Sequence, residues 1–290
     1  MKTDTMKMLF FTVLFFSVLF FVSCQKEIDW GLGGSNATSK LLVKIKSQTG
    51  TDTTQVDYYY DAKKRLIREK TTGISGGTSL DYDLFINRNS SGIITTTVQK
   101  SPSLVAVGID SIETRYNYST GTSKYTSSVF QLTIFGFTVI DSAVYSYNGA
   151  GRINSDEHYE QITGLPFPIP PSLSLKDYYI YSASGFNLDS VKQDAASIPG
   201  GPLSPAYSQA YIFDSKTNPL IILNEAILIT RIELYNANNA TKTTDKDIAT
   251  PANDFTTDYT YKYNSVNKPD SSTGTITPGG AVTTSKYFYQ

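Results

Sequence analysis

The sequence contains a single histidine, flanked by acidic residues at alternating positions. Asp156, His158 and Glu160 lie two residues apart, so on a β-strand all three side chains project from one face. An imidazole beside carboxylates is suited to proton transfer or metal binding. One histidine does not, however, provide the ligand spacing of the usual zinc sites. We therefore predict a solvated strand face here, with no catalytic residue, no metal and no cofactor.

Aspartate-serine pairs are the other recurring polar feature, and they are Asp110-Ser111, Asp141-Ser142, Asp189-Ser190 and Asp270-Ser271. Both side chains favour hydrogen bonds with nearby backbone, which predicts roles at turns and strand ends. A hydrolase acting through two carboxylates needs one selected pair of acids, and no spacing selects a pair. The sequence also lacks the nucleophile-elbow, phosphate-loop and His-Glu-x-x-His motifs. A non-enzymatic protein is therefore expected, and a hydrolase is the least favoured function.

The N-terminal segment predicts export and a lipid anchor. The apolar run Met8–Val22 follows two lysines, which is typical of a secretory signal and too short for a comfortable membrane span. The residues before Cys24 resemble a bacterial lipobox, with Phe21 in place of the usual leucine. This resemblance implies that residues 1–23 are removed and that Cys24 is lipidated. A plain signal peptide and an uncleaved anchor are the alternatives.

Residues 24–39 are predicted to be the lipidated cysteine and a flexible tether. Gln25–Asp29 resembles the export tag of Bacteroidetes surface lipoproteins, which implies display on the outer face of the outer membrane. The alternative is a tether that faces the periplasm. Gly31–Ser39 has the composition of a flexible linker. Cys24 is the only cysteine, so neither a disulfide within the chain nor a thiolate metal site is expected.

One phrase, most complete as Val144–Ile153, recurs along the remaining chain. In it two tyrosines are two residues apart and are followed by Asn or Asp, by turn residues and by an aliphatic residue, which together predict a β-hairpin. The second aromatic residue or its equivalent falls at Tyr60, Ile86, Tyr118, Tyr147, Tyr181, Phe213, Tyr263 and Tyr289. Most steps are 26 to 34 residues, which indicates a repetitive architecture. Cross-strand tyrosines of this kind chiefly stabilise sheets.

Residues 40–290 are predicted to form a single all-β domain of sequential antiparallel hairpins. So many strands usually curl or close, which predicts a barrel-like or strongly coiled sheet. Within it, Tyr207–Phe213 is expected to pair with Leu220–Ile229, and the polar stretch Asn236–Asn253 to form an exposed loop.

From about Leu41 to Gln290 the chain resembles a family of Bacteroidetes lipoproteins of unknown function, which implies a porin-like fold. Its tyrosine units also resemble the YD repeats of bacterial surface proteins and Rhs-type shells. The resemblance carries no catalytic residues. A membrane-spanning barrel is the rival interpretation, but segments such as Ile93–Lys100 and Thr256–Tyr263 lack the outward apolar band that it requires.

These observations predict a lipoprotein of the outer membrane that binds a surface glycan or polysaccharide. The alternative is a structural or adhesion protein that binds a protein partner of the envelope. Basic and acidic residues balance, with 25 Lys and Arg against 26 Asp and Glu. No basic footprint is therefore available, and a nucleic-acid partner is excluded.

Overall fold

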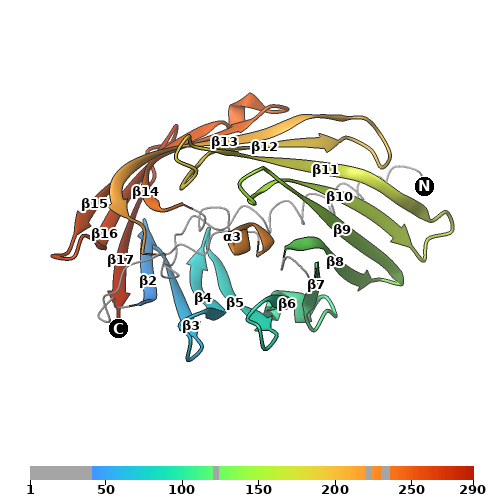
Figure 1. Ribbon diagram of the computed structural model, residues 1–290, viewed down its shortest axis with the longest axis horizontal. Helices are drawn as coiled ribbons and strands as arrows, with labels where there is room; N and C mark the ends of the chain where they lie inside the picture. The colour runs from blue at the N-terminus through green and yellow to red at the C-terminus, as the bar shows by residue number, and fades with distance from the viewer. Residues whose placement is uncertain (1–40, 120–123, 220–223, 230–235) are drawn as a thin grey trace.

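The computed structural model describes residues 41–119, 124–219, 224–229 and 236–290. The predicted signal segment, Cys24 and the tether lie outside these residues. The described chain forms a closed barrel of 16 antiparallel strands, in which each strand pairs with the next and the last pairs with the first. Figure 1 shows the barrel from one side, with helix α3 among its strands. The predicted all-β barrel is confirmed.

The strands are β2 (Leu42–Thr49), β3 (Asp52–Tyr60), β4 (Leu66–Ser75), β5 (Thr78–Arg88), β6 (Ile94–Lys100), β7 (Ile112–Tyr118), β8 (Tyr125–Ile134), β9 (Phe137–Tyr147), β10 (Ile153–Thr163), β11 (Ile169–Tyr181), β12 (Leu188–Ala196), β13 (Leu203–Thr217), β14 (Asn238–Asp247), β15 (Phe255–Tyr263), β16 (Pro269–Thr277) and β17 (Val282–Tyr289). The helices are α2 (Pro102–Ala106), α3 (Asn224–Leu228) and the 3₁₀ turn η2 (Pro251–Asn253). No helix among the described residues is long and apolar enough to cross a membrane.

The barrel closes between β17 and β2. Their pairing runs from Thr283 opposite Thr49 to Tyr289 opposite Leu42. Just beyond it, Leu41 and Gln290 exchange two backbone hydrogen bonds of 2.9 Å. Both ends of the described chain therefore lie at one end of the barrel, which we call the tether end; the opposite end is the distal end.

Alternation along the strands directs one set of side chains into the barrel and the other set outward. In β3, Val56 and Tyr58 are buried in the interior, whereas Tyr59 between Tyr58 and Tyr60 is 42% exposed. In the neighbouring strand, Lys44 faces outward and forms an ion pair with Asp57 at 3.2 Å. Because side chains alternate with period two, one register fixes this polarity for a whole strand.

The second tyrosine of the recurring phrase ties neighbouring strands together at the tether end. In four repeats its hydroxyl group donates a hydrogen bond to the backbone carbonyl of the first residue in the preceding strand. These pairs are Tyr60 with Leu42 at 2.7 Å, Tyr147 with Tyr125 at 2.9 Å, Tyr289 with Pro269 at 2.7 Å, and Tyr181 with Ile153. We call this contact the tyrosine staple. The two strands of a hairpin are joined by a turn at the distal end, and the staple joins them at the open tether end. In two other repeats, Tyr118 accepts from Asn89 and Tyr263 donates to Asp214.

The Asp or Asn after the second tyrosine caps the turn that follows. Asp61 Oδ1 accepts hydrogen bonds from the backbone N–H groups of Lys63 and Arg65, at 2.8 and 2.9 Å. Three residues after the capping side chain, the backbone adopts positive φ, as in Gly151 (76°) after Asn148. Glycine adopts this conformation at little cost, which explains its place in the phrase.

Three detailed predictions are wrong. Within Leu220–Ile229, the described residues contain helix α3 rather than a strand, and residues 220–223 lie outside the description. The stretch Asn236–Asn253 contains strand β14 rather than only a loop. In the second repeat the tyrosine position is held by Arg88, not Ile86. Its guanidinium donates to the carbonyl of Leu66, the first residue of β4, at 3.3 and 3.4 Å.

Tyr60→Phe should lower the free energy of unfolding by about 1 kcal/mol, because the carbonyl of Leu42 loses one hydrogen bond. The matched control is Tyr59→Phe, on the adjacent outward position, which should change stability by less than about 0.5 kcal/mol. Urea denaturation of both variants measures the difference. Equal effects would contradict a stabilising role for the staple.

Candidate functional site in the barrel lumen

Helix α3 lies inside the barrel and is held to the wall near the tether end (Figure 1). Arg88 from β5 binds Glu225 through two parallel contacts of 2.7 Å, the bidentate geometry that Arg and carboxylates favour. The hydroxyl of Tyr116 donates to the carbonyl of Leu228 at 2.7 Å. Leu228 and the adjacent Ile227 are both 4% exposed. This part of the interior is therefore packed.

Farther from α3, the inner wall of β9, β10 and β11 carries a polar cluster. His158 on β10 directs Nδ1 at Asp141 on β9, with distances of 3.0 and 3.2 Å to the two carboxylate oxygens. Its Nε2 lies 3.7 Å from Oδ2 of Asp156. Asp177 on β11 stands opposite Asp156 in the strand register. Glu160 pairs with Asp141 across β9 and β10 on the same face. We call these five residues the lumenal cluster.

Neighbouring strands hold the cluster in place. Tyr179 donates its hydroxyl hydrogen to Asp156 Oδ2 at 3.2 Å, and Gln193 on β12 donates an amide hydrogen to Asp177 Oδ1 at 3.0 Å. Asp156 is only 5% exposed, whereas the His158 side chain remains 25% exposed. Since His158 faces inward, this exposure means that solvent reaches the interior beside it.

Burial and charge shift the protonation of the lumenal cluster. Burial alone would lower the pKa of His158, but hydrogen bonds and charge from Asp141 and Asp156 outweigh it and raise that pKa well above its ordinary value. Burial, reinforced by the charge of Asp156, raises the pKa of Asp177 to about 7. Burial and then the charge of Asp141 raise the pKa of Glu160. These shifts favour the charged form of His158 and the neutral forms of Asp177 and Glu160.

The sequence predicted part of this site. Asp156, His158 and Glu160 do share one face, but the face lines the lumen rather than the outer surface. Asp141 lies within strand β9, so its assignment to a turn or strand end is wrong. Asp177 was not recognised at all. Only the register of β10 with β11 brings it to Asp156, and the proline-containing connection 164–168 does not reveal that register in the sequence.

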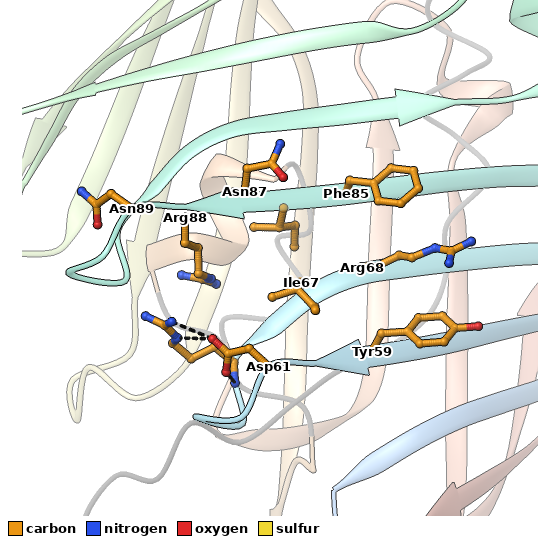
Figure 2. A pocket seen from close by; sticks show the side chains of 10 residues that line it. Tyr59, Asp61, Ile67, Arg68, Phe85, Asn87, Arg88 and Asn89 are labelled. Carbon is orange, nitrogen blue, oxygen red and sulfur yellow. Dashed lines mark hydrogen bonds and ion pairs between the residues drawn. The ribbon is translucent and has the colours of Figure 1, made fainter.

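A second candidate lies on the outer wall near the tether end (Figure 2). Arg68 lies over the rings of Tyr59 and Phe85, with its guanidinium carbon 4.9 and 5.0 Å from the ring centroids. Arg68 also binds Asp83 at 2.7 Å. The charge of Arg68 is therefore already engaged by two aromatic rings and a carboxylate, and the surface is open. We interpret this depression as a group of stacked side chains on the wall rather than as a ligand site.

The outer wall carries paired charges in neighbouring strands, alongside exposed apolar side chains such as Val144 and Ile212. Glu157 and Lys176 form one such pair at 2.7 Å, and Lys242 and Asp258 another at 3.4 Å. A barrel immersed in lipid instead carries an apolar outward band, and outward charges there are costly. The paired charges of this wall therefore argue against the membrane-spanning interpretation.

Comparison with solved structures finds the same kind of barrel in Bacteroides. A porin-like protein of Bacteroides vulgatus ATCC 8482 is similar with a TM-score of 0.51 and 10% sequence identity, over 87% of this chain and 99% of that chain. The chain therefore has a porin-like β-barrel fold. A porin-like protein of Bacteroides uniformis ATCC 8492 gives a TM-score of 0.49 at 12% identity, over 86% and 98% of the two chains. No protein-family model and no curated protein matches the sequence. The expected porin-like fold is thus confirmed.

Arg88→Met should destabilise the barrel by about 2–4 kcal/mol, because Glu225 is left half-buried without its partner. Adding Glu225→Leu should restore part of that loss, since no unpaired charge then remains. Arg115→Met is the control: it removes an ion pair whose side chains are 77% and 43% exposed, and its effect should be under about 1 kcal/mol. Urea denaturation measures all three. No recovery in the double variant would contradict this role for the pair.

Proposed function

We propose that this chain is a lipid-anchored protein of the bacterial outer membrane that captures a glycan in the lumen of its barrel, without catalysing a reaction on it. The observation that carries the proposal is a solvated inner wall on which aromatic rings alternate with amide and carboxylate groups. Aromatic faces stack on sugar rings, and fixed polar groups bind their hydroxyls.

The inner wall of β13 and β14 supplies such groups. Gln209 Nε2 donates to Asp245 Oδ1 at 2.6 Å; Tyr207 donates its hydroxyl hydrogen to the same carboxylate, and Tyr211 donates to Gln209. The ring of Tyr211 stacks on Phe213 with centroids 6.0 Å apart. Tyr207, Gln209, Tyr211 and Phe213 are partly exposed, whereas Asp245 is buried. Partial exposure of inward groups supports access by a polar ligand.

A lipid on Cys24 would hold this barrel at the membrane. Charged pairs on the outer wall, such as Glu157 with Lys176, oppose insertion into lipid, so a separate anchor accounts for an envelope location. The resemblance of Gln25–Asp29 to a surface export tag favours display outside the cell, with the periplasmic face as the alternative. The porin-like fold is compatible with either face.

Cys24→Ser should abolish lipidation, which needs the cysteine sulfur. Metabolic labelling with a radioactive or clickable fatty acid in the native host measures this directly. Labelling should be present in the unmodified chain and absent from the variant. Lipid attached to the serine variant, or none on the unmodified chain, would contradict the anchor. Extracellular protease treatment of intact cells then distinguishes surface display from the periplasmic face.

A glycan that binds in the lumen should raise the melting temperature of the purified mature protein in a saturable manner. A panel of polysaccharides and oligosaccharides provides the probes. Tyr211→Ala should weaken the response by tenfold or more, because a stacking ring is lost at about 1.5 kcal/mol or more. Tyr59→Ala, on the outer wall, should leave it unchanged. No response to any glycan would contradict capture.

A protein partner is the second candidate, and the distal end favours it. Apolar side chains project from several distal connections, and they are Phe135 (79% exposed), Phe167 (86%), Ile198 (65%) and Val105 (58%). Scattered apolar residues are ordinary, but a group at one end suits a protein interface. Cross-linking on intact cells from a distal position would identify such a partner.

A further inference from the structure

The lumenal cluster gathers four carboxylates around one imidazole. Among the described residues, none of Asp141, Asp156, Glu160 and Asp177 forms an ion pair with Lys or Arg; the recorded ion pairs of the cluster are those of His158 with Asp141 and Asp156. His158 is thus the only basic side chain in the cluster. A bound cation would supply further positive charge.

The imidazole of His158 is oriented as in a metal site. Its Nδ1 faces Asp141 at 3.0 Å, and its Nε2 faces the side of Asp156. A carboxylate on one ring nitrogen commonly fixes the tautomer that leaves the other nitrogen free for a metal ion. One ligand atom from each of Asp156, His158 and Asp177 lies within 4.8 Å of the others.

Asp156 provides an independent indication. Asp156 is 5% exposed, and its Oδ1 atom is buried without a hydrogen-bond partner in the part of the chain that the structure describes. Its other oxygen accepts the hydroxyl hydrogen of Tyr179. A buried carboxylate oxygen without a partner is costly, and a cation among these three residues would give it one.

We propose that Asp156, His158 and Asp177 bind one divalent transition-metal ion in the lumen, and that Asp141 positions His158 for this. One nitrogen and two carboxylate oxygens are ligands that Zn²⁺ accepts. Mg²⁺ and Ca²⁺ prefer oxygen ligands alone, so Zn²⁺ fits best. Three protein ligands leave a fourth position open toward the lumen. The site does not depend on glycan capture and is tested separately from it.

Isothermal titration of ZnCl₂ into the purified mature protein, freed of metal with a chelator, tests the proposal. One equivalent should bind per chain. His158→Gln and Asp177→Asn should each weaken binding at least tenfold, and Asp141→Asn should weaken it by about 10–100-fold through the orientation of His158. The control is Glu157→Gln. Glu157 lies on the same strand but on the outer wall, where it binds Lys176, so this variant should bind Zn²⁺ with unchanged affinity.

Cobalt substitution gives a second readout. Co²⁺ at the site should produce a visible absorption band that is lost in His158→Gln, and circular dichroism checks that each variant retains its sheet. If one of His158→Gln and Asp177→Asn does not fold, the other alone tests whether the metal binds at this site. Absence of saturable one-to-one binding, or unchanged binding in a folded ligand variant, would overturn the proposal. The cluster would then be an imidazolium paired with two carboxylates.

Discussion

The barrel depends on a hydrogen bond between a tyrosine hydroxyl and a backbone carbonyl, repeated around its tether end. A closed sheet must keep every strand in register over the whole circumference. The turns at the distal end join strands such as β2 and β3 at that end only. At the other end, the hydroxyl of Tyr60 reaches the carbonyl of Leu42 and fixes the same pair. Arg88 replaces the tyrosine in one repeat, and its additional donors hold Glu225 of helix α3.

The tyrosines of the staple point into the barrel, so the alternate positions point outward. Some of these outward positions carry charges, as with Lys44 and Asp57, and others carry exposed apolar side chains, as with Ile180 and Ile212. This mixed wall differs from the apolar outward band of a membrane barrel. A porin-like fold therefore does not by itself mean that the outer wall of this barrel lies in lipid. The interior of the barrel holds both a packed helix and a solvated acidic wall.

The sequence predicts the fold well because the residues that define each hairpin are neighbours in the chain. Tyr60, Asp61 and the turn that Asp61 caps lie within a few residues, so each repeat can be recognised by itself. Helix α3 escaped prediction because a short apolar run such as Leu220–Ile229 is compatible with a strand or a buried helix. Strand β14 escaped because both of its faces are polar, as at Thr243, Thr244 and Asp245. Such a strand shows no alternation in hydrophobicity.

The lumenal cluster was only partly predictable for a different reason. Asp156 and His158 share a face by their spacing alone, but their distance to Asp177 depends on how β10 pairs with β11. That register contains shifts between His158 and Tyr159 and again after Glu160. A site that forms only when two irregularly paired strands come together has no recognisable motif in the sequence of either strand.

The tyrosine face lines the inside of the barrel, and we expect the outer wall to stand in water rather than in lipid. Cys24 is the only cysteine and is expected to carry the lipid. Spin labels can therefore be placed singly at outward positions, through Thr260→Cys and Thr284→Cys, in the lipidated protein on liposomes. We expect a water-soluble nickel relaxation agent to reach both labels more readily than oxygen dissolved in the bilayer. Preferential access by oxygen at both positions would show instead that the wall is immersed in the membrane.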